Sequence, residues 1–384
     1  MRKKFLTILF GRETVLSILP GTLLGIAVML AAKALSDYIG LFSKNQLNMS
    51  HSPVSMFLLA IILGMLTRNM IRLPAIFDPG IEFCVKKLLR LGIILLGIRL
   101  SIMAVGKIGI ISLLVASLCV LSGLVSAYYL ARLAGVGSRL GTLIASGTSI
   151  CGVTAIIAVS PCIEAREEET TYAISTITIF GLLVTLIYPY AIELVLHLTP
   201  AQAGIFLGTA IHDTSQVTGA AFIYDQLWRT EISQIAITTK LIRNILMTVV
   251  IPILAMLHAK DKENCCHSRT KSLWSYFPKF VLGFLTLAIF RSIGDFFTGQ
   301  GSDGFLFWTS AESWGSFCLT VKDMAMYILA VAISGAGLCT RFDKLKKLSY
   351  KPFLIGLAAA VIVGCVSFFL VVLLKAPIGS LGGL

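Results

Sequence analysis

Long apolar runs dominate the chain, and short polar or charged segments separate them. The runs lack the strict alternation of apolar and polar positions that a barrel strand needs, so each is predicted to be a helix. About eleven runs can be counted, and most are long enough to cross a bilayer. They lie at residues 15–35, 53–66, 91–106, 108–130, 140–162, 171–196, 203–223, 232–257, 277–297, 321–339 and 353–374. The pattern predicts an all-α polytopic membrane protein with about 11 transmembrane helices and one integral membrane domain over residues 1–384. The second run is short and begins at Pro53, so it is a candidate half-helix or re-entrant segment.

Composition supports this class. Of the 384 residues, 57% are hydrophobic and 13% are charged, whereas soluble globular domains contain about 25% charged residues. The basic segment Met1–Arg12 precedes an apolar run long enough to remain as a helix, so no cleaved signal peptide is expected. Nine cysteines, mostly single residues within apolar runs, are interpreted as packing residues rather than as a disulfide framework.

The net charge of +13 indicates membrane orientation, not nucleic-acid binding. Alternating the runs places every strongly basic connection on one side, including the N-terminus and the segments near residues 68–90, 260–271 and 341–351. The acidic segment Glu164–Glu169 falls on the other side and is expected to begin a solvated helix. Because basic loops stay in the cytoplasm, the N-terminus is predicted to be cytoplasmic.

A polar segment interrupts the middle of the run at 203–223. Asp213 lies about ten residues, or roughly 15 Å, into this run, near the centre of a ~30 Å hydrocarbon core. Ionisable groups at such depth usually face a partner or a wet cavity and mark ion or substrate pathways. The candidate binding residues here are His212, Asp213, Thr214, Ser215 and Gln216.

A second polar segment interrupts the run at 140–162, and it matches the first loosely when Thr148 is aligned with Thr214. Glycine and small hydroxyl residues weaken a helix, and two interrupted polar-centred segments are typical of a secondary-transporter site. Close helix packing through small residues is the alternative for the glycines, but it does not explain Asp213. The candidates in this segment are Ser146, Gly147, Thr148, Ser149, Cys151 and Gly152. We expect the transport part to occupy about residues 140–257 and the remaining helices to form a scaffold.

Two cations lie within the run at 232–257. Lys240 and Arg243 are three residues apart and therefore share one helix face. With His212 and Asp213 they could form a substrate or proton site, in which the cations attract an anion and His212 titrates near neutrality. An internal ion pair that joins two helices is the structural alternative. Main-chain donors at a broken helix suit an oxyanion, whereas hydroxyls and carbonyls suit Na⁺, and residue types alone do not separate the two.

An internal repeat is also predicted. The segment at 91–101 resembles the segment at 329–341, since each is a glycine-bearing helix that ends in a basic and hydroxyl cluster. The two run in opposite directions in the predicted topology, as inverted repeats with discontinuous helices require.

Other chemistry is not indicated. The cluster Cys265-Cys266-His267 lacks zinc-ligand spacing, so no metal site is expected. There is no P-loop, GxGxxG or nucleophile triad, so neither an enzyme nor an ATP-driven pump is predicted, and no cofactor is expected.

Several of these motifs occur together in one family. Gly147–Gly152, the Glu167–Glu169 run, the segment Ala210–Val217 and Lys240-Leu241-Ile242-Arg243 stand in the order seen in bacterial inner-membrane proteins labelled as a sulfate exporter family, and most of the chain resembles them. Thr214-Ser215 stands where that family has Thr-Ala. The resemblance implies kinship with cation–proton antiporters and bile-acid-type symporters, which have inverted repeats, crossing discontinuous helices and a moving core beside a scaffold.

The leading hypothesis is a secondary transporter of the bacterial inner membrane that exports a small inorganic or sulfur-containing anion, such as sulfate, coupled to H⁺ or Na⁺. The first alternative is a Na⁺/H⁺ antiporter in which Asp213 exchanges the two cations. The second is a non-transport membrane subunit or an intramembrane enzyme. The expected partners are membrane lipid, the anion and the coupling ion, with no nucleic acid and with a homodimer as one candidate assembly.

Overall fold

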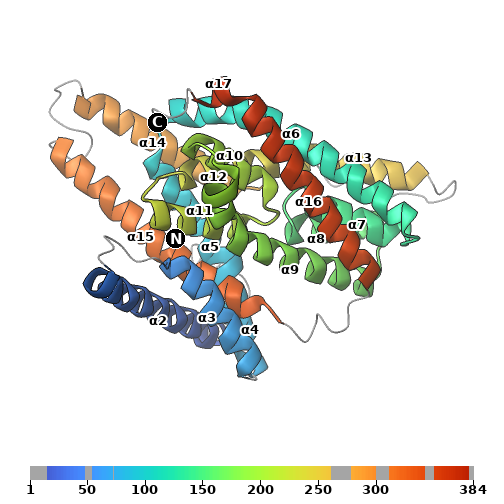
Figure 1. Cartoon of the computed structure of the whole chain (residues 1–384), viewed down its shortest axis with the longest axis horizontal. Coiled ribbons are helices and arrows are strands. Elements are labelled where there is room, and N and C mark those ends of the chain that lie inside the picture. Colours follow the sequence, from blue (N-terminus) through green and yellow to red (C-terminus); the bar gives the residue numbers. More distant parts are fainter. Residues whose placement is uncertain are drawn as a thin grey trace. The chain divides into compact units, whose positions relative to one another are not determined.

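The computed structural model describes residues 15–47, 54–71, 73–260, 278–299, 311–341 and 350–379. All regular elements within these ranges are helices, so the predicted all-α class is confirmed (Figure 1). Seven of the described helical segments are long and apolar enough to cross a membrane, and two shorter apolar helices accompany them. The protein is therefore a polytopic membrane protein, although the described residues do not confirm the predicted count of about 11. The seven segments are Leu16–Lys44, Ile102–Leu133, Glu167–Leu196, Ser233–Leu254, Phe280–Thr298, Glu312–Cys339 and Lys351–Leu373.

Helix contacts group the chain into two compact units, which are described one at a time. Unit 1 comprises Met1–Ile102, Phe222–Arg229 and Phe280–Asp343. Its long helices are α2 (Val15–Leu47), α3 (Met56–Met70), α14 (Phe280–Gly299) and α15 (Ala311–Cys339). Between α3 and residue 102 it holds η1 (Ala75–Phe77), α4 (Asp78–Phe83), η2 (Cys84–Leu88), α5 (Leu89–Leu96) and η3 (Gly97–Arg99).

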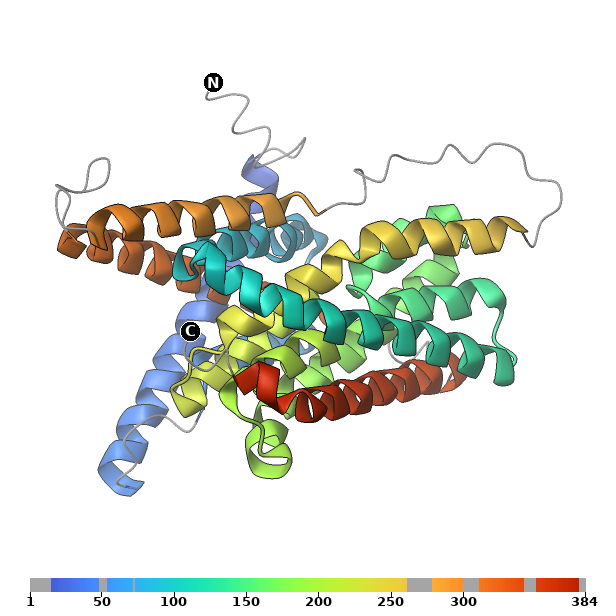
Figure 2. The ribbon, with the colours of Figure 1, turned by 90° about the horizontal axis from the view of Figure 1, so that it is seen from above.

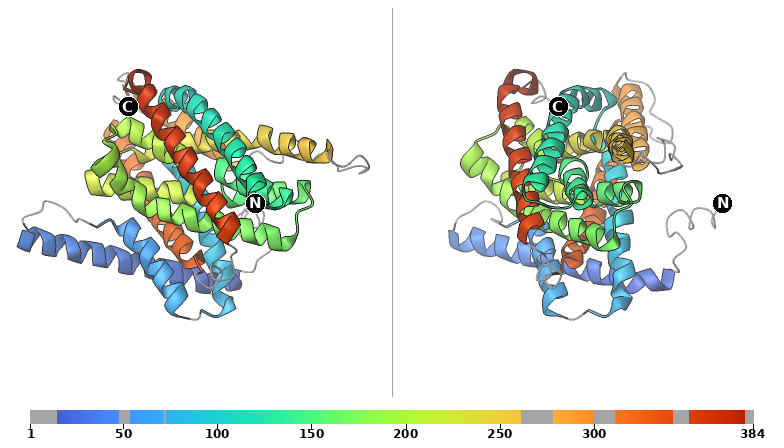
Figure 3. Two further views of the ribbon diagram at one scale, coloured as in Figure 1. Left: turned by 45° about the vertical axis from the view of Figure 1, so that its right-hand side comes forward. Right: turned by 90° about the vertical axis from the view of Figure 1, so that its right-hand side faces the viewer.

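Helix α15 packs against α2, α3 and α5, and α2 lies beside α3 (Figure 3). Glycines allow the backbones of α3 and α15 to approach closely. A Cβ on Gly64 would lie 2.7 Å from the Ser334 carbonyl oxygen, and one on Gly337 would lie 2.4 Å from the Ile61 carbonyl oxygen. Such small-residue contacts are a common means of helix association in lipid, because the hydrophobic effect does not drive two helices together there.

The boundary between the third and fourth apolar runs was predicted wrongly. The third run was expected to end near residue 106, but α6 is one continuous helix from Ile102 to Leu133, and the interruption lies at Leu100 and Ser101. Lys107 lowers the local hydropathy without breaking the helix, because its side chain is exposed on the outer face of α6.

Unit 2 comprises Met103–Ala221, Thr230–Lys279 and Lys344–Leu384. Helix α6 is its longest helix (Figure 2), and α16 contacts α7, α9 and α10. The other elements follow the chain in order. They are α7 (Ser138–Ser149), α8 (Val153–Val159), η4 (Ser160–Cys162), α9 (Glu167–Ala191), η5 (Ile192–Leu196), α10 (Pro200–Ala210), α11 (Thr214–Trp228, first half), α12 (Ser233–Ile245), α13 (Met247–Lys260), α16 (Tyr350–Leu373) and α17 (Lys375–Gly379).

Local sequence explains where two of these helices begin. Helix α9 starts at the predicted acidic run, and the Glu169 carboxylate accepts a hydrogen bond from the Arg166 backbone N–H (2.9 Å). Helix α10 starts with Pro200 after Thr199, whose backbone N–H donates to Gln202 Oε1 (3.0 Å). In both cases a side chain of the first turn accepts a hydrogen bond from the N-cap backbone N–H, which is one half of a capping box, and the acidic residues in the first turn of α9 also interact favourably with the positive end of the helix.

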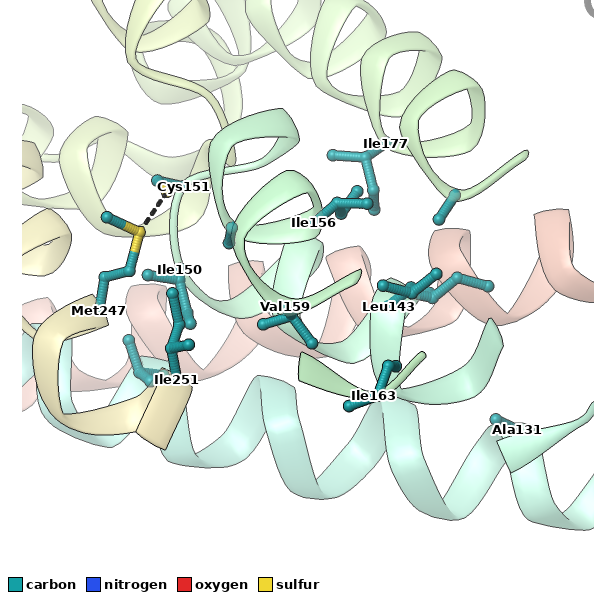
Figure 4. Packing of buried hydrophobic residues seen from close by; sticks show 14 of the residues in the cluster. Ala131, Leu143, Ile150, Cys151, Ile156, Val159, Ile163, Ile177, Met247 and Ile251 are labelled. Atoms are coloured by element: carbon teal, nitrogen blue, oxygen red, sulfur yellow. Dashed lines mark hydrogen bonds between the residues drawn. The ribbon is translucent and has the colours of Figure 1, made fainter. Parts of the chain in front are cut away.

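A cluster of buried apolar side chains surrounds the point where α7 gives way to α8 (Figure 4). Ile150 and Ile156 lie within it, Ile177 reaches it from α9 and Ile251 from α13. Cys151 Sγ is 3.5 Å from Met247 Sδ. Tight packing here holds the interrupted segment in one conformation, because a loose fit would lose dispersion contacts on every side.

Candidate functional site

Helix α7 is interrupted at Ile150–Gly152. Ile150 has φ −111° and ψ −91°, and Gly152 has φ 63° and ψ −125°, a backbone conformation that residues with a Cβ rarely adopt. The break lies inside the predicted segment, but Gly147 itself belongs to α7. Its missing side chain makes room for Ile156 and Ile177, whose nearest atoms would be 2.8 and 2.9 Å from a Cβ. Gly147 therefore has a packing role, while Gly152 produces the break.

The second interruption lies between α10 and α11, at Ile211, His212 and Asp213. Asp213 caps α11, because its Oδ1 accepts hydrogen bonds from the Ser215 backbone N–H (2.9 Å) and the Ser215 hydroxyl (2.6 Å). In return, the Asp213 backbone N–H donates to Gln216 Oε1 (3.2 Å). This reciprocal arrangement matches a capping box with Gln at its third position. The polar residues of this segment thus form the start of α11, the second half of the interrupted helix.

The two interruptions meet in space, as predicted. His212 Nδ1 lies 2.9 Å from the Thr148 carbonyl oxygen. A Cβ on Gly152 would lie 3.3 Å from Asp213 Oδ2, so a larger residue would press on the carboxylate. Since a carbonyl oxygen can only accept, Nδ1 of His212 carries the proton in this contact. Its Nε2 is buried and has no hydrogen-bond partner among the described residues.

Lys240 on α12 is fully buried and donates to three main-chain carbonyl oxygens. Two belong to the second interruption, Ile211 (2.9 Å) and His212, and the third to the first interruption, Ile150 (3.1 Å). Three acceptors match the three N–H donors of an ammonium group, whereas a neutral amine has only two. The three acceptors therefore suit an ammonium group at Lys240.

Arg243 is also fully buried, one helical turn beyond Lys240. Its Nε donates to the Ser149 carbonyl (2.8 Å) and its Nη2 to the Thr148 carbonyl (2.7 Å), both at the end of α7. Its Nη1 donates to the Thr209 carbonyl (2.7 Å) and the Ile211 carbonyl (2.9 Å), at the end of α10. The rigid fork of donors in a guanidinium suits this divided task better than a lysine would.

Both cations thus cap the carboxyl ends of two half-helices. Each such end leaves carbonyls without helical partners and bears about −0.5 elementary charge. Lys240 and Arg243 supply hydrogen bonds and positive charge at one point where α7 and α10 end. Within the described part of the chain, neither forms an ion pair with Asp213, so the structural alternative of a direct ion pair is not observed. Asp213 is half-buried and keeps a carboxylate that no described cation pairs.

The other predicted site residues differ in what their polar atoms contact. The hydroxyls of Ser146 and Thr148 bond carbonyls of their own helix, at Leu143 (2.9 Å) and Ile144 (2.9 Å). The Ser149 hydroxyl is buried without a partner among the described residues. Cys151 contacts Met247, as described above. None of these four side chains donates to the other interruption in this conformation; the first segment reaches the second through its main chain.

Two neighbours of the site were not predicted. Asn244 follows Arg243, donates through Nδ2 to the Thr214 hydroxyl (3.2 Å), and has a buried Oδ1 with no partner among the described residues. The second is Thr178 on α9, whose backbone carbonyl accepts a hydrogen bond from Nε2 of the predicted residue Gln216 (3.2 Å). An amide directly after Arg243 in an apolar run was a usable signal for Asn244. A backbone carbonyl on α9 leaves no signal in the sequence, because every residue has one. The cluster at Cys265 lies outside the described residues.

Comparison with known proteins places the chain in a family. The family model described as conserved hypothetical protein 698 matches residues 20–356. The chain belongs to this family. The UPF0324 membrane protein OB3406 of Oceanobacillus iheyensis is 34% identical over 309 residues, covering 80% of this chain and 84% of the relative. A UPF0324 membrane protein of Streptococcus pneumoniae is 32% identical over 332 residues, covering 86% of this chain and 91% of the relative.

The names of these relatives describe bacterial membrane proteins and no activity. Among solved structures, the sodium proton antiporter MjNhaP1 from Methanocaldococcus jannaschii is a match, and the alignment covers 91% of this chain and 99% of the MjNhaP1 chain. Its sequence identity is 12% and its TM-score is 0.20, so this likeness supports no argument about fold or function. The conserved hypothetical protein 698 family therefore establishes a multi-pass bacterial membrane protein, and the activity has to be argued from the site.

Proposed function

We propose that this member of the conserved hypothetical protein 698 family is a secondary transporter whose substrate and coupling ion bind where the two interrupted helices meet. One observation supports this most directly. The half-buried Asp213 carboxylate lies beside the break at Gly152, and two fully buried cations bond the main-chain carbonyls of the two residues before it, Ile211 and His212. Discontinuous helices with charged residues at a membrane-buried meeting point are the usual construction of secondary-transporter sites.

The proposed substrate is a small inorganic or sulfur-containing anion, such as sulfate, moved in exchange for or together with H⁺ or Na⁺. Lys240 and Arg243 supply two positive formal charges against one negative charge on Asp213, and this excess favours an anion. Their N–H donors are directed at main-chain carbonyls. We therefore assign to Lys240 and Arg243 the positive electrostatic field of the site and the conformation of its backbone. Hydrogen bonds to the anion would come from groups such as the Thr214 hydroxyl and the Asn244 amide, which lie together.

Cation–proton antiport is the second candidate, and one observation favours it. Seven hydrogen bonds to carbonyls occupy seven of the eight N–H donors of Lys240 and Arg243. Asp213 would then be the group for which Na⁺ and H⁺ compete. In either case the proposal assigns the protein no catalytic reaction and places it in the bacterial inner membrane with a cytoplasmic N-terminus.

Flux through reconstituted protein tests the proposal. Wild type, Asp213→Asn and the matched control Asp323→Asn, an exposed carboxylate on α15, would be placed in liposomes with imposed pH and Na⁺ gradients. We expect uptake of labelled sulfate, sulfite or thiosulfate that depends on the pH gradient in wild type and the control but not in Asp213→Asn. Na⁺/H⁺ exchange without anion movement, lost in Asp213→Asn, would favour the second candidate. No flux of any tested ion above empty liposomes would contradict the transporter proposal.

A further inference from the structure

We infer that this site moves its anion and a proton in the same direction, because protonation of Asp213 and anion binding favour each other. The inference rests on the proposed anion transport and adds the sign of its coupling. It follows from the hydrogen bonds that each charged group around Asp213 already makes.

Lys240 and Arg243, which bond the carbonyls of His212 and Ile211 just before Asp213, are fixed in place by main-chain partners. Lys240 makes three hydrogen bonds and Arg243 four, all to carbonyl oxygens at the ends of α7 and α10. Those two helix ends carry roughly one negative charge between them, which offsets part of the two cations. Neither cation can turn to the Asp213 carboxylate without leaving buried carbonyls unpaired.

The two carboxylate oxygens of Asp213 differ in their hydrogen bonds. Oδ1 accepts two hydrogen bonds from Ser215 at the positive end of α11. Among the described residues no donor bonds Oδ2, which faces the break at Gly152. An anion that entered this meeting point would place a second negative charge within a few ångströms of that oxygen.

The sign of coupling follows from Coulomb's law. Two like charges this close in a half-buried site repel, and protonation of Asp213 removes the repulsion. By reciprocity, a bound anion must raise the affinity of Asp213 for a proton by the same factor. Proton and anion are then bound and released together. A cationic substrate would compete with the proton instead, which gives exchange.

The other titratable groups that face Asp213 do not supply this proton as simply. His212 donates from Nδ1 to the Thr148 carbonyl, and a second proton on Nε2 would create a third cation beside Lys240 and Arg243. Cys151, on the facing break, is buried against Met247. Asp213 is the group whose protonation lowers the charge repulsion that an anion meets.

Calorimetry on the purified full-length protein in detergent tests the inference. Binding of sulfate and thiosulfate, which do not themselves titrate over the range, would be measured from acidic to alkaline pH, each in two buffers that differ in ionisation enthalpy. The difference between buffers gives the number of protons taken up per anion. We expect uptake approaching one proton and an affinity that rises as pH falls, by at most about tenfold per pH unit for a single linked proton. Asp213→Asn should bind with pH-independent affinity, while His212→Gln should keep the proton uptake.

The wild-type measurement alone decides the sign if a variant fails to fold. Release of protons on anion binding, or affinity that rises with pH, would overturn the inference and leave anion transport standing. Proton uptake that persists in Asp213→Asn and vanishes in His212→Gln would also overturn it, because the proton would then reside on His212. Absence of binding by every tested anion would remove the proposed anion function and this inference together.

Discussion

Replacing Arg243 with methionine should destabilise the fold before it affects any ligand. Four carbonyls would lose a donor, but two of them keep another: Thr148 retains His212, and Ile211 retains Lys240. The carbonyls of Ser149 and Thr209 have no other described donor. A buried acceptor left unpaired costs about 1–3 kcal/mol, so the change should cost roughly 2–6 kcal/mol of stability.

Thermal unfolding of detergent-purified protein, followed by loss of the monodisperse peak in size-exclusion chromatography, measures this effect. At roughly 2 °C for each kcal/mol, the apparent melting temperature should fall by at least about 4 °C. Arg243→Lys should lose less, because an ammonium can still serve up to three carbonyls. The control Arg132→Met, at the exposed end of α6, should stay within about 0.5 kcal/mol of wild type. If Arg243→Met melted with the control, the two half-helix ends would not depend on this guanidinium, and the capping account would be wrong.

Three further changes have defined outcomes. Gly152→Ala should destabilise the protein by about 1–3 kcal/mol through its positive φ, and it should also displace Asp213. The control Gly135→Ala, at a position with φ 68° and open space around it, measures the backbone effect alone. Equal loss of flux in the two variants would show that the contact with Asp213 does not matter. Gly181→Ala places a Cβ 1.9 Å from Gln216 Oε1, so it should break the cap of α11 and lower the melting temperature; an unchanged value would refute that packing. A cysteine at Lys86, on a background without native cysteines, should react with an impermeant thiol reagent only in inside-out vesicles, and labelling of intact cells would reverse the predicted orientation.

The helices were largely predictable because lipid requires continuous apolar segments. Apolar runs located α9, α14, α15 and α16 to within several residues at most ends. Prediction failed where a helix boundary depends on one backbone conformation or on one charged side chain. Lys107 suggested a loop that does not exist, and α15 begins ten residues before its predicted start, because its first turns include polar residues that hydropathy excludes.

The candidate site was only partly predictable. Hydropathy and charge pointed to Asp213, Lys240 and Arg243, and the expected approach of the two interrupted segments is confirmed by the contact between His212 and Thr148. What the cations bond could not be foreseen, since their acceptors are main-chain carbonyls, and a carbonyl has the same chemistry in every residue. Only the convergence of two helix ends selects these acceptors, and that depends on the three-dimensional fold.

Proton movement that accompanies anion entry tests the central claim most directly. Liposomes that contain wild-type protein and an internal pH indicator, with no initial pH gradient, would receive an inward gradient of the anion that the protein transports. The account predicts internal acidification in wild type and in Asp323→Asn, and none in Asp213→Asn, because the proton travels on Asp213. Acidification of equal size in Asp213→Asn, or alkalinisation in wild type, would contradict it.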